Sequence, residues 1–516
     1  MKLGWKIFII VGIFVVVFTG IWLMTMNIQP ENGVEAYKKS LRERGEKLEI
    51  SEVLPPVVAP ESNGVELVEA AFKLLPPADD WSNQPSAMRI ILPGKALIGW
   101  QQPDLREFGY MGYTNSWANA MADAESNLPT IELLQQAANY PVIDFQLDYQ
   151  KGFGVGFTHL MPMRKSAQRL SAALMCDLHT GDAASATTNL CTLLSLAQGE
   201  QNERLQIAQL VRSALVINAA SATWELLQST NVTDRELARL QESWERMEFV
   251  RAMENAMVME RAIQEDMLRK ARVSNSESRR LLFGGPSSGT SAGDWWQDAQ
   301  DRFKDMRDGF GIATRRSKWS YSDETLILEY DQIALGAVRV VETNRYFLPA
   351  YNEMVSRTAK LGLYKPASGN WLLRVSGLDQ FERVFSQFSY SPNEITMRRV
   401  MAIEACQHIV VTAIALKRYE LRHGNFPEKL SELTPELLPA VPLDPVDGKP
   451  LRYRRNVDGS FLLYSVGVDG KDDGGDAATS TVNNIQNWVN DHARDWVWPQ
   501  PATQAEVQRY YAAPHK

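Results

Sequence analysis

The side chains with the clearest potential for chemistry are aspartates gathered toward the C-terminal end of the chain. Seven of them stand close together: Asp444, Asp447, Asp458, Asp469, Asp472, Asp473 and Asp476. The last four lie in a glycine-rich stretch, GVDGKDDGGD. Ca²⁺ is bound by roughly six to eight oxygens, from Asp side chains and backbone carbonyls, on flexible loops of this kind. The sequence therefore predicts a structural Ca²⁺ site with Asp469, Asp472, Asp473 and Asp476 as its ligands.

The alternative for the same stretch is a solvated acidic loop that closes a small sheet. The spacing does not match an EF-hand, because the register of the aspartates is wrong and no Glu stands at the twelfth position. Crowded carboxylates repel one another unless a cation or solvent separates them. If Ca²⁺ binds, it stabilises a glycine-rich loop whose ordering costs a large conformational entropy.

Standard catalytic motifs are not found elsewhere in the sequence. None of the six histidines has a second His at HExxH spacing, and neither GxSxG nor a P-loop occurs. Cys176, Cys191 and Cys406 fall in apolar helical patterns, which predicts buried structural thiols rather than disulfides or a zinc site.

One further charged region could do chemistry. Glu254, Glu260 and Glu265 alternate with arginines at helical spacing. This pattern predicts a solvated helix with ion pairs on its surface, and a carboxylate active site is the alternative.

The elements that must position the C-terminal aspartates can be predicted from periodicity and turn signals. A helix is expected over 394–422, because Gly424 and Pro427 provide the usual helix-stopping residues. A strand is expected near Leu451, followed by a turn at Asp458-Gly459 and a second strand over 460–466. The acidic loop then follows the second strand.

This order of helix, prolines, two strands and an acidic glycine-rich loop resembles the C-terminal domain of the major pseudopilin of type II secretion systems. The resemblance covers 416–488 and rests on Leu416, Tyr419, Gly424, Pro427, Leu433, Leu438, Pro442, Asp444, Pro445, Gly448, Tyr453, Tyr464, Ser465, Gly467, Asp469, Gly470, Gly474, Gly475 and Trp488. It implies a small antiparallel β-module whose loop binds Ca²⁺. Unlike pseudopilins, the chain has no Glu near the start of its apolar N-terminal segment, and that segment lies far from the module.

The whole chain is also similar to uncharacterised bacterial membrane-anchored proteins, a resemblance that implies no activity. The expected fold is mainly α, with a helical-repeat-like or bundle body and the small antiparallel β-module. The expected segments are a transmembrane anchor (1–29), a stalk (30–65), a helical body (66–283), a flexible linker and loop (284–320), a helical region (321–415), the pseudopilin-like module (416–488) and a tail (489–516).

The N-terminal segment predicts the location of the protein. Residues 7–26 carry no charge, and twenty helical residues span roughly 30 Å, the thickness of a bilayer core. A cleaved signal peptide is the alternative, although its apolar run would be shorter. Lys2 and Lys6 precede the segment, so the positive-inside rule places the N-terminus in the cytoplasm and the bulk of the chain outside a bacterial inner membrane.

Composition narrows the classes of function. Lys and Arg number 54 against 62 Asp and Glu, so the net charge of −8 disfavours a dedicated nucleic-acid binder. We expect a non-catalytic, membrane-anchored envelope protein whose calcium-stabilised module contacts a protein partner. The alternatives are a component associated with type II secretion or a pilus, and a membrane-anchored hydrolase with an unrecognised site.

Overall fold

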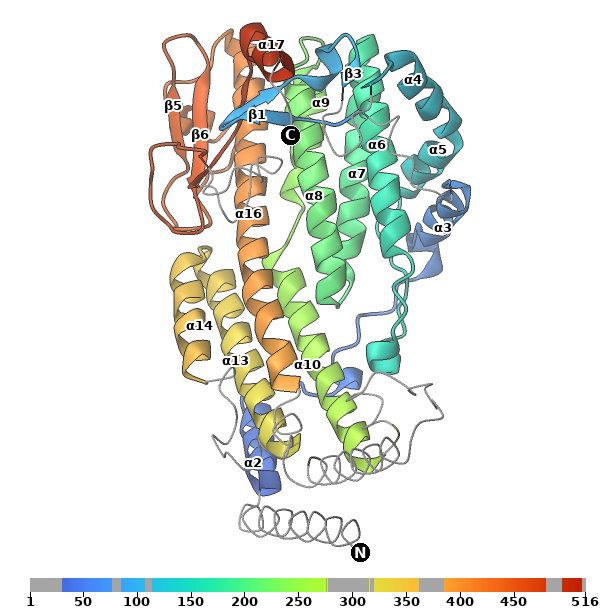
Figure 1. The fold of residues 1–516 in the computed structure, drawn as a ribbon, viewed down its shortest axis with the longest axis vertical. Coiled ribbons are helices and arrows are strands. Elements are labelled where there is room, and N and C mark those ends of the chain that lie inside the picture. Colours follow the sequence, from blue (N-terminus) through green and yellow to red (C-terminus); the bar gives the residue numbers. More distant parts are fainter. Residues whose placement is uncertain are drawn as a thin grey trace, which may run out of the picture.

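The structure is a computed structural model that describes residues 30–76, 85–106, 114–274, 320–361, 385–478 and 494–512, together with Ser276 and Arg315. The predicted membrane anchor, the Gly- and Ser-rich stretch 284–293 and Trp488 lie outside the described residues. The described residues are mainly helical, with small β-sheets at the periphery (Figure 1). The prediction of a mainly α protein is therefore confirmed.

One half of the molecule is a bundle of antiparallel helices. It contains α6 (Leu160–Thr180), α7 (Ala183–Gly199), α8 (Gln206–Leu227) and α9 (Asp234–Glu245). Gly181 ends α6 in a left-handed conformation, and the side chain of Asp182 caps the N-terminus of α7. Thr233 and Glu236 form a capping box at the N-terminus of α9.

The longest helix, α16 (Phe385–His423), runs along both halves of the molecule (Figure 1). It packs against α8, α9 and α13. Its stretch Asn393–His423 is long and apolar enough to cross a bilayer, but most of that stretch is buried inside the protein, which is typical of a core helix. Cys406 on this helix is buried, as are Cys176 and Cys191, so the prediction of buried thiols is confirmed.

The other half contains α2 (Pro30–Glu43), α10 (Val250–Val273), α13 (Ser320–Asn344) and α14 (Leu348–Lys360). Helix α2 covers part of the segment expected to form a stalk. Its Val34 and Leu41 are fully buried in a cluster with Leu328 of α13. Burial of both side chains places α2 within the packed body.

The prediction of a solvated α10 is wrong for two of its charged side chains. Arg261 is fully buried, and its Nη2 donates to Oε2 of Glu46 at 2.8 Å. Glu265 is also buried, and its Oε2 lies 2.7 Å from Nζ of Lys38. The physical reason is that α2 and the segment after it pack against α10 and supply partners of opposite charge.

Short elements complete the fold. The further helices are α3 (Val65–Leu74), α4 (Trp117–Ser126), α5 (Leu128–Ala137) and α17 (Gln504–Ala512), with 3₁₀ turns at Ile50–Glu52, Pro60–Ser62, Gly99–Gln101, Tyr149–Gly154, Glu200–Asn202 (η5) and Leu430–Leu433. Strands β1 (Arg89–Leu92), β2 (Lys95–Leu97) and β8 (Gln500–Pro501) form one sheet, in which β2 and β8 are parallel, and β3 (Leu105–Arg106) pairs with β4 (Thr114–Asn115).

The C-terminal sheet lies beside α16 and consists of β5 (Arg452–Arg455), β6 (Phe461–Val466) and β7 (Asp495–Val497) (Figure 1). The antiparallel hairpin β5–β6 confirms the two predicted strands. Strand β7 was not predicted. It brings Trp496 into the core, where this side chain is fully buried, and Trp498 is buried close by. Both tryptophans therefore belong to the hydrophobic core.

Candidate metal centre

Three titratable side chains from two separate segments meet at one end of the α6–α7 pair. His159 is the N-cap residue of α6. Glu200 is the first residue of the short 3₁₀ turn η5 after α7, and Glu203 is its C-cap residue. Gln209 of α8 holds this turn, because its Nε2 donates to the backbone carbonyls of Glu200 and Glu203 at 2.9 and 2.8 Å. The backbone that carries both carboxylates is therefore fixed by a side chain from a third segment.

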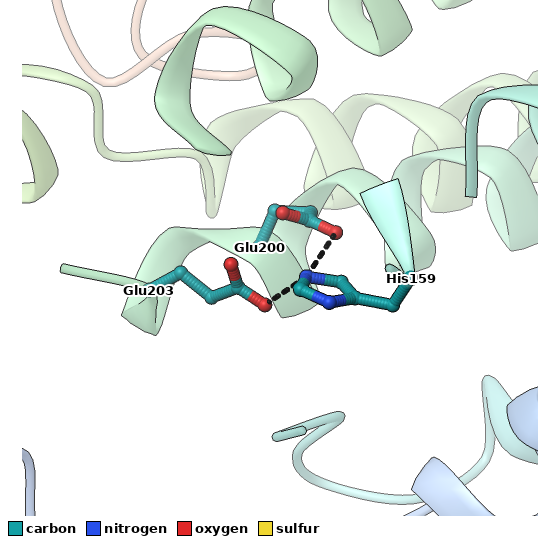
Figure 2. Close-up of side chains that lie close together, drawn as sticks. All are labelled: His159, Glu200 and Glu203. Carbon is teal, nitrogen blue, oxygen red and sulfur yellow. Dashed lines mark ion pairs between the residues drawn. The ribbon is translucent and has the colours of Figure 1, made fainter. Parts of the chain in front are cut away.

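The three side chains point toward one another (Figure 2). Nε2 of His159 lies 2.7 Å from Oε1 of Glu203 and 4.0 Å from Oε1 of Glu200. One possible ligand atom from each of the three residues can be chosen so that all three atoms lie within 4.8 Å of one another. The geometry is therefore that of three donors around one small volume.

The group is closed off from solvent and poor in hydrogen bonds. The exposed fractions of His159, Glu200 and Glu203 are 7%, 0% and 4%. Apart from the 2.7 Å contact between Nε2 of His159 and Oε1 of Glu203, the four oxygens of the two carboxylates have no hydrogen-bond partner among the described residues. Buried carboxylate oxygens are almost always hydrogen-bonded or bound to a cation, because each unpartnered one keeps its full desolvation cost.

The electrostatics oppose charge on each of the three groups by itself. Burial raises the pKa of Glu200 well above its ordinary range, and the nearby Glu203 raises it further. Burial raises the pKa of Glu203 to about 8, and burial lowers the pKa of His159. A dication reverses these preferences, because two carboxylates, a neutral imidazole and a divalent ion form a neutral group.

The surroundings hold the ring and the turn in place. The ring of Phe145 stacks on the ring of His159 with 4.2 Å between centroids. Arg212 is fully buried near Glu200, but its guanidinium donates to other acceptors, among them the carbonyls of Ala197 and Glu248. Arg212 therefore contributes a favourable field without occupying the space between the carboxylates.

The donor set suits a first-row divalent metal. Imidazole nitrogen together with carboxylate oxygen is typical of Zn²⁺, Mn²⁺ and Fe²⁺, whereas Ca²⁺ and Mg²⁺ favour oxygen donors alone. Bidentate carboxylates or water complete the coordination of such ions.

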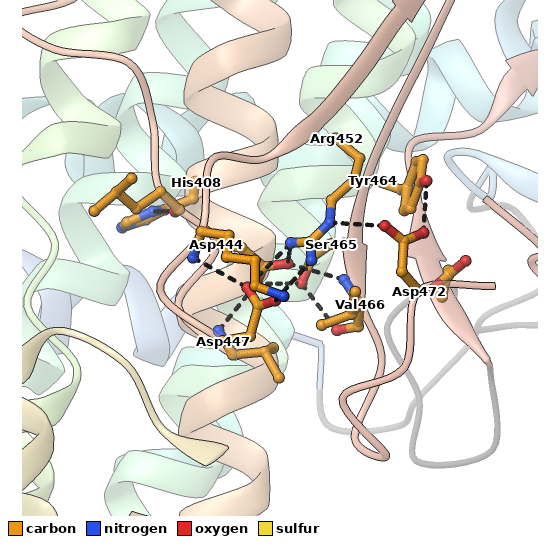
Figure 3. Close-up of polar contacts among 12 residues, drawn as sticks. His408, Asp444, Asp447, Arg452, Tyr464, Ser465, Val466 and Asp472 are labelled. Atoms are coloured by element: carbon orange, nitrogen blue, oxygen red, sulfur yellow. Dashed lines mark hydrogen bonds and ion pairs between the residues drawn. The ribbon is translucent and has the colours of Figure 1, made fainter. Parts of the chain in front are cut away.

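The predicted Ca²⁺ ligands lie in a different region and face different partners. Asp472 accepts hydrogen bonds from the hydroxyl of Tyr464 at 2.8 Å and from the backbone N–H of Gly474 at 3.1 Å (Figure 3 shows the Tyr464 contact). Asp469 accepts one from the N–H of Lys471, and Oδ2 of Asp476 lies 2.7 Å from a guanidinium nitrogen of Arg494.

The loop that carries these residues is organised around an anion. The carboxylate of Asp495, on β7, is buried and accepts hydrogen bonds from the backbone N–H groups of Asp473, Gly475 and Asp476 at 3.5, 2.8 and 3.2 Å. A loop that points its N–H groups inward forms a nest for negative charge. Calcium binding by Asp469, Asp472, Asp473 and Asp476 stays a prediction.

A further carboxylate, Asp444, is the most completely partnered acid among the described residues of this module. It is fully buried and accepts four hydrogen bonds, from Ser465 Oγ, Val446 N, Val466 N and Arg452 Nη1, at 2.7 to 2.9 Å (Figure 3). Arg452 also donates to Asp447 and Asp472. One guanidinium thus neutralises three of the aspartates that the sequence groups together.

Sequence reasoning missed His159, Glu200 and Glu203 as a site. The available signal was weak. Glu200 and Glu203 are separated by three positions, which places them on the same side of a helical turn, but His159 lies far away in the sequence and joins them only through the packing of α6 on α7.

Comparisons with models of protein families, with curated protein sequences and with solved structures found no match to this chain.

Proposed function

We propose that this protein is a non-catalytic, membrane-anchored envelope protein whose helical body is held together by a divalent metal ion bound to His159, Glu200 and Glu203. The observation that carries the metal is the fully buried carboxylate of Glu200. Its two oxygens have no hydrogen-bond donor among the residues that the structure describes, and it faces an imidazole and a second carboxylate. Zn²⁺ and Mn²⁺ are the ions that best fit these donors.

The burial of the three donors supports a structural role for the ion. Catalytic metal sites keep an open coordination position that a substrate can reach, whereas structural sites are closed. At most 7% of any of the three side chains is exposed. The ion would join the N-terminus of α6 to the turn that leads from α7 into α8, so its binding energy becomes folding energy.

The proposed location comes from the sequence. The uncharged run 7–26 serves as the anchor in the lipid bilayer, Lys2 and Lys6 stay on the cytoplasmic side, and residues 30–516 face the extracytoplasmic side of a bacterial inner membrane.

The C-terminal module is the proposed contact surface for a protein partner. Its pseudopilin-like character is supported by the hairpin β5–β6, by the order of its prolines and glycines, and by the acidic loop after β6. Its edge strand β5 carries the exposed Arg454 and the half-buried Arg455. Charged residues on an edge strand discourage non-specific strand pairing, which favours a selective partner.

Metal content tests the central part of the proposal. The purified full chain is loaded with Zn²⁺ or Mn²⁺, dialysed, and measured by inductively coupled plasma mass spectrometry. We expect one equivalent per chain in the wild type and loss of the metal in E200Q and H159A. E260Q is the matched control, because the Glu260 carboxylate has its own partner, the backbone N–H of Gln206 at 2.6 Å.

A second readout separates loss of the ion from loss of the fold. Co²⁺ replaces Zn²⁺ in sites with nitrogen and oxygen donors and gives an absorption spectrum that reports their geometry. Folded E200Q protein, checked by circular dichroism, is expected to lack the Co²⁺ spectrum of the wild type. A metal-free wild type that melts identically with and without Zn²⁺ and Mn²⁺ would refute the proposal.

A further inference from the structure

An open groove lies beside α7. Its volume is about 790 Å³. The floor is formed by α7, which presents Thr188, Thr192 and Ser195 at helical spacing, and by the turn after it. One wall comes from the end of α5 and the residues that follow it, and the other wall comes from α9.

The lining is polar but carries no net charge. Side-chain amides line both the wall and the floor of the groove. Gln136 and Asn139 lie on one wall, and Gln198 lies on the floor. The charged residues balance, because Glu132 and Glu242 are matched by Arg239 and Arg246. Glu242 and Arg246 also form an ion pair with each other.

This lining argues against three classes of ligand. A polyanion would need an excess of positive charge, which the balanced pairs do not provide. A lipid or another apolar ligand would need an apolar cavity. An extended peptide would pair with an exposed strand edge or place alternate side chains in apolar pockets, and the walls here are helices and a loop rich in amides and hydroxyls.

We propose that the groove binds a neutral glycan chain. Amide and hydroxyl side chains are both donors and acceptors, as sugar hydroxyls are, so the two sets match without any charge. Tyr140 stands in the wall with 39% of its surface exposed, and its ring offers an apolar face on which a sugar ring can stack.

The groove adjoins the metal centre, and this part of the inference rests on the proposed function. Gly199 lines the groove and packs so closely on Ile143 of the wall that an added Cβ would lie 2.8 Å from the Cβ of Ile143. The next residue is Glu200, and Phe145 stacks on His159. A metal ion at His159, Glu200 and Glu203 would therefore fix the floor of the groove against the wall at the point where Gly199 packs on Ile143.

Isothermal titration calorimetry of the full chain with chitohexaose and with maltohexaose tests the proposal. Q198L and Y140A remove an amide and the stacking ring, and Q508L is the matched control on the exposed surface of α17. We expect binding of at least one of the two oligosaccharides, a loss of tenfold or more in affinity in Q198L and in Y140A, and wild-type affinity in Q508L.

The outcomes separate this proposal from the metal. Q198L and Y140A are expected to keep one equivalent of metal, whereas E200Q is expected to lose the metal and to bind the glycan several-fold more weakly. A glycan affinity that is equal in wild type and E200Q would remove the link to the metal centre. No binding of either oligosaccharide at millimolar concentration, binding that Q198L and Y140A leave unchanged, or binding only of a neutral hexapeptide would overturn the glycan proposal.

Discussion

Two groups of acidic residues in this protein differ in their spacing along the sequence and in their hydrogen-bond partners. The C-terminal aspartates are dense in the sequence. The fully buried Asp444 and the more exposed Asp472 and Asp476 each accept hydrogen bonds from a basic or hydroxyl side chain or from backbone N–H groups. The glutamates of the metal centre are buried, and apart from the contact of Glu203 with His159 their oxygens lack a hydrogen-bond donor among the described residues. A candidate metal site is therefore indicated by buried carboxylates that have no cationic side chain in contact. A high density of carboxylates in the sequence does not by itself indicate one.

Within the acidic region, the protein's own side chains and backbone N–H groups balance the negative charge. Arg452 supplies the positive charge between Asp444, Asp447 and Asp472, and Asp495 fills the nest of the loop. In the helical body Arg212 lies near Glu200 but does not bond to it. Where the protein carries its own cation in contact, a metal is not required for charge balance.

The largest effect is expected at the best-partnered acid. D444A leaves the buried N–H groups of Val446 and Val466 without an acceptor and removes one carboxylate from Arg452. We expect a loss of about 3–5 kcal/mol in the free energy of unfolding, measured by urea denaturation. D458N, at an exposed turn, is the control and should change this free energy by less than about 0.5 kcal/mol. A loss below about 1 kcal/mol for D444A would show that the network is not structural.

A buried acid without a histidine partner is expected to bind a proton. Burial raises the pKa of Asp331 to about 7, opposed in part by Arg261, and Asn393 donates to its Oδ1 at 3.1 Å. Because the pKa in the folded state lies above the ordinary value, this group favours folding below about pH 4 and loses that contribution as the pH rises toward 7. The expected slope is about 1.4 kcal/mol for each pH unit over this range.

D331N provides the comparison, since an amide replaces the protonated acid without titrating. The free energy of unfolding of wild type minus that of D331N is measured between pH 4 and 8, so that other titrating groups cancel. We expect this difference to fall up to about pH 7 and then to level off. A flat difference would mean that Asp331 is ionised throughout and that Arg261 outweighs burial.

The metal centre is expected to contribute somewhat less. An ion that binds the folded state alone, present at 100 times its Kd, stabilises a protein by about 2.7 kcal/mol. Zn²⁺ or Mn²⁺ should therefore raise the melting temperature of the wild type relative to a sample with chelator, and E200Q should show no such difference. If D469A with D472A abolished the rise in melting temperature and E200Q did not, the metal would bind at the C-terminal loop and the assignment of the site to Glu200 would be wrong.

Local signals explain which parts of the fold could be predicted. Gly181 with Asp182, and Thr233 with Glu236, set helix ends through contacts within a few residues, and the hairpin turn at Gly459 is equally local. Strand β7 could not be predicted, because it forms by pairing with β6 across a long connection.

The candidate site was hidden for the same reason. His159 stands alone in the sequence, and only the packing of α6 on α7 and the hold of Gln209 on the following turn bring it to Glu200 and Glu203. The burial of Arg261 and Glu265 was likewise invisible, since their partners lie in and just after α2, far away along the chain.

The smallest effect is expected for Ca²⁺ at the acidic loop. To coordinate an ion there, Asp472 would have to give up hydrogen bonds from Tyr464 and Gly474, and Asp476 its contact with Arg494. The backbone N–H groups of Gly475 and Asp476 donate to Asp495, so the side of the loop that faces Asp495 offers hydrogen-bond donors and not the oxygen ligands that Ca²⁺ needs. We therefore expect Ca²⁺ to raise the melting temperature by less than Zn²⁺ or Mn²⁺ does, and D469A with D472A to remove that rise without changing the response to Zn²⁺. A Ca²⁺ shift larger than the Zn²⁺ shift and lost in the same double variant would show that the loop rearranges around the ion, and that the partners seen for its carboxylates are those of the calcium-free state.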